Sequence, residues 1–460
     1  MEHSSTMEVS KKIAHLVLKN GGRAFFVGGY VRDRIRGIDN KDIDIEIHGI
    51  LPQTLENILD TVGKRKEIGK SFGVYTLQNY NIDIAMPRKE TPTGRGHRDF
   101  KIDVDPFIGT EKAASRRDFT VNAIMQNVLT GEIVDHFGGL QDISSGVLRH
   151  VNNSTFNEDP LRVLRGAQFA ARFGFEIAPE TISLCRDIDV KTLSSERVFD
   201  EMKKALLKAQ KPSLFFEHLR TMGKLGYWFS ELEELINIKQ HSVHHKEGDV
   251  WTHTMMVLDE AAKKREDAQN PLYFMISALV HDLGKITNTE VVKGEYHAYG
   301  HENAGVSIAE KFLHRITNEN ALISYVLNMT KLHMKPNTIA ADKSSIKATN
   351  KMFDSSKSPR DLILLALCDG LGKIPQKPQE ETNAFLTDRL NIFEEYMSRP
   401  YVTGKDLINA GIKPGKDFAA LLTHAHKLRL SGVDKETALK EVLRYAEKQN
   451  LIFFMKNVDV

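Results

Sequence analysis

The chain has 460 residues, the length of about three domains. Apolar residues make up 41% and charged residues 27%, which excludes wholesale disorder, and a net charge of +2 excludes a basic field over the whole molecule. The two cysteines, Cys185 and Cys368, lie too far apart for a CxxC zinc module and are too few for a disulfide framework, so a reducing cytoplasm is expected. No apolar run is long enough for a signal peptide or a membrane span, so neither secretion nor a membrane partner is expected.

Hydrophobic periodicity changes along the chain and predicts an α+β protein. From Arg23 to about Asp135, short strand-like runs alternate with helical segments (AFFV, DIDIEI, GVYTL, NIDIAM, GEIVDHF). Beyond Asn157 the apolar residues recur every three or four positions, as in helices. We therefore predict a head with a mixed sheet and helices over 1–150, followed by an all-α body. Breaks in the pattern divide that body into 151–236, 237–380 and 381–460.

A glycine turn follows the first predicted strand. AFFV ends in Gly28 and Gly29, and Tyr30 to Asp33 is typical of the opening of a short helix. A strand, a glycine turn and a helix N-terminus together present backbone N–H groups and a positive dipole end, which suit a triphosphate. A Gly-Gly pair by itself is more often a plain turn.

Acidic residues alternate with isoleucines on the next predicted strand. Asp42, Asp44 and Glu46 therefore share one face, while the isoleucines fill the core. Asp83, in a similar alternating run, is expected on a neighbouring strand. Three carboxylates on one face suit Mg²⁺-assisted phosphoryl transfer, although an isolated acid pair is more often the solvated face of a strand.

Three ordered motifs identify a family for the first half of the chain. GGYVRD with DID, then RRDFTVNA from Arg116, then EDPLRVLR from Glu158 resemble the bacterial class II CCA-adding tRNA nucleotidyltransferases, whose head is polymerase β-like, over about residues 20–235. The resemblance implies that Asp42 and Asp44 bind Mg²⁺ and that Asp83 is the third catalytic carboxylate, where members often carry Glu. It places these residues at the nucleotide: Gly28, Gly29, Arg32, Arg116, Arg117, Asp118, Asp159, Arg162 and Arg165.

The third motif resembles the family's amino-acid template, in which an Asp and an Arg bond to the incoming base. Asp159 precedes Pro160, which suits the first helical position, and Arg162 lies three residues on, on the same helix face. A carboxylate that accepts from the exocyclic amine and a guanidinium that donates to the ring acceptors can together bind either C or A. The alternative is an ordinary capped helix with an i, i+3 salt bridge.

The polar segment between Asp83 and Arg116 predicts a mobile loop rather than a core element. In the family, a flexible loop at this place helps to switch specificity from C to A. A markedly shortened loop would indicate an enzyme that adds only part of the tail. Because the loop of this chain is not shortened, the resemblance implies complete CCA addition.

A second constellation lies in the helical body. Histidines and carboxylates from several predicted helices can converge on a divalent metal and lower the pKa of its bound water. Their order resembles the HD phosphohydrolase superfamily over about 240–375, with Lys285 as its basic residue. The resemblance implies a divalent transition metal or Mg²⁺ on His253, His281, Asp282 and Asp369, and a second metal on His301 and His333. Some CCA-adding enzymes carry such a domain with phosphatase, 2′,3′-cyclic phosphodiesterase and 2′-nucleotidase activity.

The resemblances predict a cytoplasmic enzyme that adds the 3′-terminal CCA to tRNA from CTP and ATP and releases pyrophosphate, with a phosphohydrolase activity in the HD domain. Lysines of the helix around Lys203 to Lys211 either follow tRNA phosphates or form a solvated helix face. The stretch Thr403 to Gly415 resembles a C-terminal motif of CCA-adding enzymes and disfavours a poly(A) polymerase. Three rival functions remain: a poly(A) polymerase or partial-tail (CC- or A-adding) enzyme, a metal phosphohydrolase with an RNA-binding N-terminal part, and an inactive tRNA-binding scaffold. The oligomeric state stays open.

Overall fold

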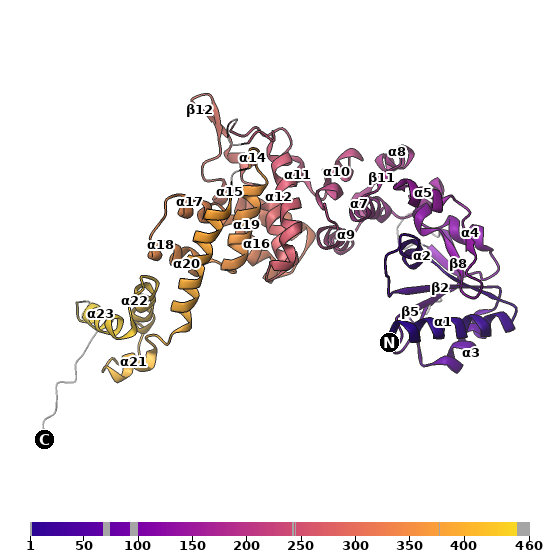
Figure 1. Ribbon diagram of the computed structural model, residues 1–460, viewed down its shortest axis with the longest axis horizontal. Coiled ribbons are helices and arrows are strands. Elements are labelled where there is room, and N and C mark those ends of the chain that lie inside the picture. Colours follow the sequence, from indigo (N-terminus) through magenta and orange to yellow (C-terminus); the bar gives the residue numbers. More distant parts are fainter. Residues whose placement is uncertain are drawn as a thin grey trace, which may run out of the picture. The chain divides into compact units, whose positions relative to one another are not determined.

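A computed structural model describes residues 2–67, 74–92, 100–241, 243, 245–376 and 378–448. The chain forms two compact units, one of Met1–Ala209 with Leu214–Trp228 and one of Gln210–Ser213 with Phe229–Val460 (Figure 1, indigo to magenta and red to yellow). This division is coarser than the four segments expected from the sequence, which stay a prediction.

The first unit is built on a mixed sheet, as the sequence predicted. Its strands follow the order β3-β4-β5-β2-β1-β8-β9. Only β2 and β5 pair in parallel; the other neighbours are antiparallel. The bounds are β1 Arg23–Phe26, β2 Ile43–His48, β3 Arg65–Glu67, β4 Val74–Leu77, β5 Ile82–Ala85, β8 Met125–Asn127 and β9 Ile133–Val134.

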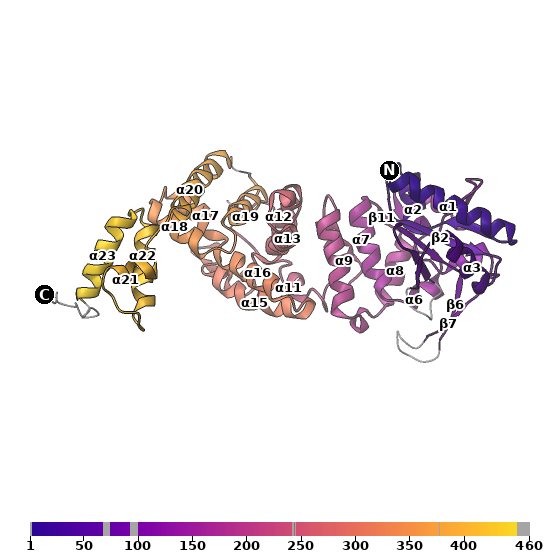
Figure 2. The same ribbon diagram turned by 90° about the horizontal axis from the view of Figure 1, so that it is seen from below.

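The isoleucines of β2 form the middle of the head core. Ile43, Ile45 and Ile47 are buried together with Ile13 of α1 (Glu2–Lys19) and Leu55 of α3 (Pro52–Val62). Figure 2 shows α1 and α3 next to the sheet. Because side chains alternate along a strand, this packing turns the acidic residues of β2 to the opposite face. The short helix α2 (Gly28–Ile35) follows β1, as expected, and packs on β2.

One predicted loop of the head is in part a hairpin. β6 (Arg88–Pro92) and β7 (Phe100–Val104) pair antiparallel, and residues 93–99 between them lie outside the described part of the chain. The prediction of a loop was wrong for these strands, because the polar, glycine-bearing composition hid the alternation in FKIDV.

Helices complete the first unit. β10 (Val147–Leu148) and β11 (Glu176–Ile177) form a small parallel pair among them. The helices are α4 Thr110–Ser115, η1 Thr120–Asn122, α5 Gly139–Ser145, α6 Asn153–Asn157, α7 Leu161–Phe173, α8 Pro179–Asp187, η2 Val190–Thr192, α9 Ser195–Lys208 and α10 Ser213–Thr221.

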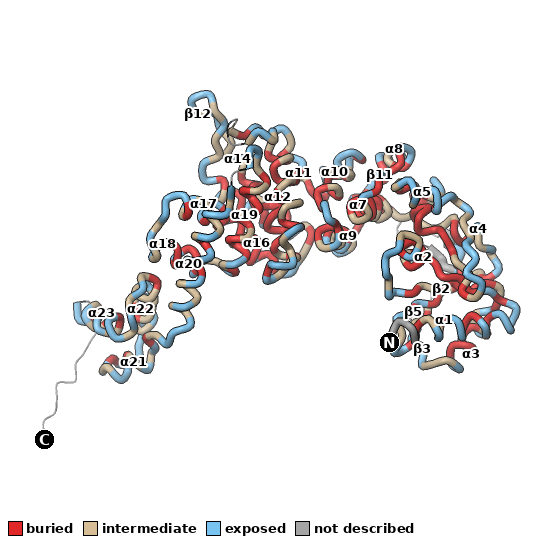
Figure 3. The backbone as a smooth tube through the Cα atoms, in the orientation of Figure 1, coloured by how far each residue is buried: buried red, intermediate tan, exposed pale blue. Residues whose placement is uncertain are grey.

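The second unit is helical, and its middle helices are buried on most sides (Figure 3). α12, α13, α16 and α19 pack on one another, and α15 packs on α16. The helices are α11 Ser230–Glu233, α12 Val250–Lys264, η3 Arg265–Asp267, α13 Pro271–Val280, α14 Lys285–Asn288, α15 His301–Ile316, α16 Asn320–Leu332, α17 Met334–Ala341, α18 Ile346–Ser355, α19 Pro359–Leu371, α20 Glu380–Ser398, α21 Gly404–Asn409, α22 Phe418–Leu430 and α23 Lys435–Lys448. The α+β class is confirmed.

A small hairpin interrupts this helical unit and was not predicted. β12 (Glu290–Val292) and β13 (Glu295–His297) pair antiparallel around Lys293 and Gly294. Both turn residues have positive φ, 54° and 85°, as a two-residue type I′ turn requires. The run VVKGEYH carries the hairpin signal, but it is too short to stand out between helical segments.

The last three helices have a core of their own. Leu407 of α21, Leu421 of α22 and Val442 of α23 are buried in one cluster. Thr403 and Asp406 form a reciprocal capping box that begins α21. Within the described residues, none of the helices combines the length and apolar character needed to cross a bilayer.

Candidate active sites

The glycine turn lies directly against the acidic strand in the first unit. The backbone N–H of Val27 donates to the Asp44 carbonyl oxygen at 3.0 Å. Gly28 has a φ of +66°, and a Cβ built there would lie 3.4 Å from Asp44 Oδ2 and 3.3 Å from Arg117. The start of α2 and the Asp44 carboxylate therefore form one wall of the same site.

The three predicted carboxylates influence one another. Asp44 pairs directly with Asp83 across the parallel β2–β5 ladder, which confirms that Asp83 lies on a neighbouring strand. Burial and the charge of Asp83 raise the pKa of Asp44 to about 6, while Arg117 opposes this shift. Burial and the charge of Asp42 raise the pKa of Asp83. Asp42 precedes β2, is exposed and accepts a hydrogen bond from the Asn81 amide.

This carboxylate set fits a hard divalent cation. Mg²⁺ prefers oxygen ligands, and its positive charge relieves the repulsion between neighbouring carboxylates. The described residues hold three groups whose ligand atoms lie within 4.8 Å of one another, and all three are in the second unit. The head carboxylates do not form such a group among the described residues.

A cleft of about 490 Å³ opens in front of Asp44. Arg172, Lys208 and Asn122 also line it, so cations surround the acidic pair. Of the residues predicted at the metals and the nucleotide, the cleft brings together Gly28, Gly29, Arg32, Asp42, Asp44, Arg117, Asp118 and Arg165. A cleft lined by both carboxylates and guanidinium groups suits a metal-bound polyphosphate.

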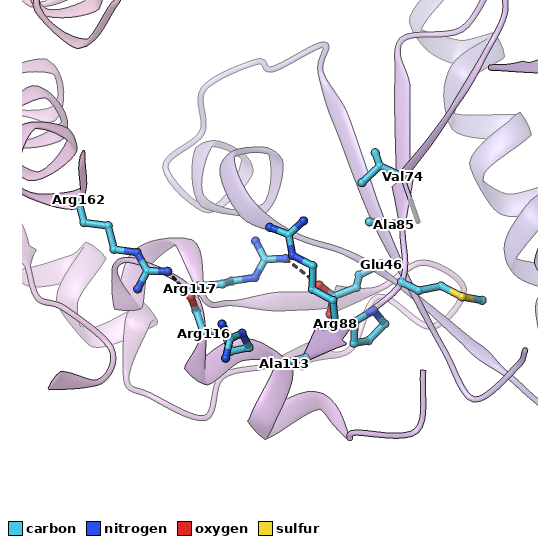
Figure 4. A pocket seen from close by; sticks show the side chains of 10 residues that line it. Glu46, Val74, Ala85, Arg88, Ala113, Arg116, Arg117 and Arg162 are labelled. Carbon is cyan, nitrogen blue, oxygen red and sulfur yellow. Dashed lines mark hydrogen bonds and ion pairs between the residues drawn. The ribbon is translucent and has the colours of Figure 1, made fainter. Parts of the chain in front are cut away.

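Arg116, Arg117 and Arg162 line a neighbouring cavity of about 310 Å³ (Figure 4). Arg117 donates to Glu46 Oε2 at 3.1 Å, so the second acidic residue of β2 holds a predicted phosphate contact. Arg162 donates to the Thr155 carbonyl at 2.6 Å and to the Arg116 carbonyl at 2.7 Å. Because these two carbonyls hold its guanidinium in place, the N–H donors of Arg162 have a fixed orientation at the cavity.

Asp159 does not form the alternative salt bridge with Arg162. Its Oδ1 accepts a hydrogen bond at 3.1 Å from the N–H of Leu161, the first residue of α7. Both of its oxygens lie 3.0–3.1 Å from Arg197 Nη2 in α9. Sequence reasoning missed Arg197, because a partner from a distant helix leaves no local signal.

Asp118 and Arg165 form an ion pair in the lining of the cleft, in which Asp118 is buried and Arg165 is partly exposed. Asp118 is 8% exposed and accepts from Arg165 Nε at 2.8 Å and Asn122 Nδ2 at 3.0 Å. Burial opposes its ionisation, but Arg165 and Asn122 hold the pKa of Asp118 below its usual value. Arg32 is 3% exposed, donates to Asn122 at 2.6 Å and lies over the Phe173 ring. This network ties α2, η1 and α7 together.

The histidines and carboxylates of the second site converge, as the sequence predicted. They come from α12, the turn between α13 and α14, α15, the end of α16 and α19. His253 Nε2 lies 3.1 Å from Asp369 Oδ1, and His281 Nε2 lies 3.2 Å from Asp282 Oδ2. All of them are buried: His253, His281, Asp282, His301, His333 and Asp369.

The six side chains form two groups with Asp282 between them. His253, His281 and Asp369 form one group, and Asp282, His301 and His333 form the other. Asp282 Oδ2 faces the first group, while its Oδ1 lies 3.1 Å from His301 Nε2 and 3.6 Å from His333 Nε2. This is the arrangement that a carboxylate bridging two metal positions requires.

The donor set of this site fits divalent metal ions. His281 Nε2 is buried without a hydrogen bond of good geometry. The Nε2 atoms of His301 and His333 face each other at 3.2 Å, and both Nδ1 atoms are already engaged by backbone carbonyls. A buried imidazole nitrogen without a hydrogen bond, together with imidazole nitrogens that converge on a shared carboxylate, is a donor set that suits a divalent metal.

Two lysines lie beside these ligands. Lys285 Nζ lies 2.7 Å from Asp282, and Lys373 Nζ lies 3.0 Å from Asp369. Burial would raise the pKa of both carboxyls, but His281 and Lys285 hold the pKa of Asp282 well below its usual range, and Lys373 does so for Asp369. A cavity of about 410 Å³, lined by both lysines, opens onto the site.

Glu247 positions His253 from the opposite side. Its fully buried carboxylate lies 3.3 Å from His253 Nδ1 and 2.6 Å from His245 Nδ1, and it accepts from Ile374 N at 2.8 Å. Sequence reasoning missed Glu247, because it lies in an irregular segment without a periodic pattern. Lys373 was also missed, although it follows Asp369 by one helical turn.

Three family models match the chain in order. One described as the poly A polymerase head domain matches residues 24–149, and one described as a probable RNA and SrmB-binding site of polymerase A matches 174–236. A third, described as the HD domain, matches residues 250–373. The first and third cover the two sites described above.

Known proteins resemble the chain over most of its length. A multifunctional CCA protein of Actinobacillus pleuropneumoniae serotype 5b (strain L20) is 33% identical over 374 residues, 79% of this chain and 88% of its own. A Thermotoga maritima CCA-adding enzyme complexed with tRNA matches with a TM-score of 0.64 at 20% identity, covering 97% of this chain and 98% of its own. Complexes of a CCA-adding enzyme with ATP and with CTP match with TM-scores of 0.66 and 0.65, both at 18% identity, covering 98% and 97% of this chain and 95% of theirs. At these identities the solved structures establish the fold.

Proposed function

The chain belongs to the multifunctional CCA protein family, and from this premise we propose that it builds the 3′-terminal CCA of tRNA from CTP and ATP, releasing pyrophosphate. The observation that carries the proposal is the 490 Å³ cleft, in which Asp44 lies against the Gly28 turn and faces Arg117 and Arg165. A poly(A) polymerase would share the head, but a relative named for CCA covers 79% of the chain, and the HD domain model matches residues 250–373.

Asp42 and Asp44 would hold Mg²⁺ at the edge of β2, with Asp83 beside them. When bound, this ion neutralises charge on the triphosphate and lowers the pKa of the attacking hydroxyl. Arg117, fixed by Glu46, and the basic residues of the cleft receive the phosphates that leave as pyrophosphate.

Base selection belongs to Asp159 and Arg162 in this proposal. Arg162 is held by two carbonyls and Asp159 by Arg197, so both side chains have fixed directions before a nucleotide enters. A fixed guanidinium donates to ring acceptors, and a fixed carboxylate accepts from an exocyclic amine; C and A both offer this pair.

The second site favours a phosphohydrolase. His253, His281, Asp282 and Asp369 would hold one divalent metal, and Asp282, His301 and His333 a second. When bound, the metals supply a hydroxide nucleophile at neutral pH. Lys285 and Lys373, at the cavity wall, offset the charge of a phosphate ester, and Glu247 holds the His253 ring in place. Both activities belong to the cytoplasm, where tRNA and nucleoside triphosphates occur together.

Extension of tRNA transcripts tests the proposal. Transcripts that end before CCA are incubated with CTP, ATP or both, and the products are sequenced. CTP alone should add two residues, and both nucleotides together should add three. Long A tails would establish the poly(A) polymerase instead, and addition that stops at C or requires a CC end would establish a partial-tail enzyme.

A further inference from the structure

The polar face of β2 extends beyond the carboxylate that is proposed to hold metal. Because side chains alternate along a strand, Asp44, Glu46 and His48 lie on the same face of β2. Glu46 is 9% exposed and His48 is 4% exposed, so neither belongs to an ordinary solvated strand face. The alternation that suits a metal site therefore continues into a buried carboxylate and a buried imidazole that are not metal ligands.

Glu46 has one partner on each side. His48 Nε2 lies 2.9 Å from Glu46 Oε1, and since a carboxylate only accepts, the imidazole donates. Arg117 Nη2 donates to Glu46 Oε2 at 3.1 Å (Figure 4). Burial opposes ionisation of Glu46, but His48 and Arg117 hold the pKa of Glu46 below its usual value. The three side chains therefore form a connected series in which an ionised carboxylate holds the guanidinium.

Arg117 also lies beside Asp44. A Cβ built at Gly28 would lie 3.3 Å from Arg117 Nη1 and 3.4 Å from Asp44 Oδ2, so the guanidinium and the Asp44 carboxylate border the same small space. Burial and Asp83 raise the pKa of Asp44, and the charge of Arg117 counteracts them. Among the described residues, however, Arg117 forms its ion pair with Glu46 and not with Asp44. Two carboxylates therefore compete for one guanidinium, and Glu46 holds it.

The outcome of this competition decides what Asp44 can bind. A guanidinium that pairs with a carboxylate at two points occupies both oxygens and neutralises their charge. An Asp44 carboxylate paired in this way would offer a divalent cation neither ligand atoms nor charge. A cation that prefers oxygen ligands therefore depends on Arg117 being held elsewhere.

We propose that Glu46, oriented by His48, is a positioning residue that keeps Arg117 off Asp44. Asp44 then stays available to Mg²⁺, and the remaining N–H groups of Arg117 are directed to the nucleotide phosphates. The inference rests on the metal role proposed for Asp44. It goes beyond that role by assigning control of the metal affinity to two buried residues outside the ligand set.

Iron-directed cleavage of the full chain measures metal binding without any enzymatic activity. Fe²⁺ replaces Mg²⁺ in the absence of tRNA and nucleotide, and with ascorbate and peroxide it cuts the backbone next to its site. The fragments are mapped by mass spectrometry. The quantity measured is the Fe²⁺ concentration that gives half-maximal cutting near Asp44. Cuts near His281 report the second site in the same sample and serve as an internal control.

Substitutions of Glu46 test the competition. Glu46→Gln should raise the half-maximal Fe²⁺ concentration near Asp44 about tenfold, because Arg117 then pairs with Asp44. Glu46→Asp keeps the charge but withdraws the carboxylate from Arg117, and it should have a similar effect. A native value for Glu46→Asp would show that charge alone is sufficient and would overturn the positioning role. Glu56→Gln is the matched control, since Glu56 of α3 pairs with Arg65 on the isoleucine side of the sheet, and it should change nothing.

A second substitution separates competition from damage to the fold. Arg117→Ala in the Glu46→Gln background removes the competing guanidinium and should return the half-maximal Fe²⁺ concentration to near the native value. A strand that is merely destabilised would not regain its metal through a further loss of contacts. Absence of this recovery would therefore contradict the role of Glu46.

Substitutions of His48 test the second contact. His48→Leu removes the donor to Glu46 and should weaken Fe²⁺ binding near Asp44 less than Glu46→Gln does, whereas His48→Gln supplies an amide donor and should restore the native value. Equal effects of Leu and Gln would exclude His48 from the series. If the native chain were not cut near Asp44, the metal role in the proposed function would be wrong. A native cut that Glu46→Gln leaves unchanged would refute only the role of Glu46.

Discussion

The two sites hold similar carboxylates in opposite surroundings. In the second unit, Asp282 and Asp369 are buried but each has a lysine within 3.0 Å, and their pKa values lie well below the usual range. In the head, Asp44 faces Asp83 across the ladder, and its pKa is raised to about 6. The protein itself supplies counter-charges for the carboxylates of the second site, whereas the charges of Asp44 and Asp83 add to each other and call for a cation from outside the protein. Both sites still have ligand sets that fit metal ions.

The largest effect on activity is expected from substitutions that inactivate one site and spare the other. Asp44→Asn should lower CCA addition by about 10³-fold, because several kcal/mol of charge stabilisation is lost, and should leave phosphohydrolase activity unchanged. His281→Ala should do the reverse. Both activities are assayed on the same preparations. If Asp44→Asn spared nucleotide addition, the metal role proposed for the head would be wrong.

A single added methyl group tests how closely the second site is assembled. A Cβ at Gly284 would overlap the His301 carbonyl, because the turn after Asp282 packs directly on the start of α15. Gly284→Ala should therefore separate Asp282 from His301, lower the bound metal measured by mass spectrometry and reduce phosphohydrolase activity about 100-fold. CCA addition should stay at the native rate, and Gly294→Ala on the exposed hairpin turn should retain its metal.

The sequence predicted those site residues that belong to a regular pattern or an ordered motif. Alternation on β2 was sufficient to place Asp44 opposite the isoleucine core, and the register confirms its pairing with Asp83. In the second unit, the resemblance of the histidine and aspartate order to the HD superfamily pointed to six ligands, and the structure brings these six together. A periodic pattern shows which face of a helix or strand is buried. It therefore predicts the position of a side chain when that position depends only on the face.

The sequence could not predict partners fixed by tertiary contacts. Arg197 reaches Asp159 from a helix more than 30 residues away, and Glu247 reaches His253 from an irregular segment. Neither position has a periodic signal. The β12–β13 hairpin was also missed, because short strands within a helical region are outweighed by the longer pattern around them.

Arg165 tests whether the head also contains a charge pair of the kind found in the second site. Arg165→Met leaves the buried carboxylate of Asp118 without its cation and should destabilise the first unit by about 3 kcal/mol. Arg165→Lys should recover part of this loss. Urea unfolding is followed by tryptophan fluorescence in a Trp251→Phe background, where Trp228 reports on the first unit alone. An unchanged midpoint for Arg165→Met would show that the pair contributes nothing to stability.

The smallest expected effect is a shift in the pH dependence of metal binding by the head. Asp44 is protonated below about pH 6, so bound Mg²⁺ must displace a proton there, and affinity should fall about tenfold per pH unit below that value and stay level above it. Ionisation of Asp44 also removes folded-state stability as pH rises from its ordinary value of 3.8 toward 6, because the folded form binds the proton more tightly. Asp83→Asn removes the neighbouring charge and should move the inflection in a Mg²⁺ titration to lower pH, whereas Asp105→Asn should not. An inflection that stays near 6 in Asp83→Asn would mean that burial alone sets the pKa of Asp44, and the head would then differ from the second site in solvation rather than in charge pairing.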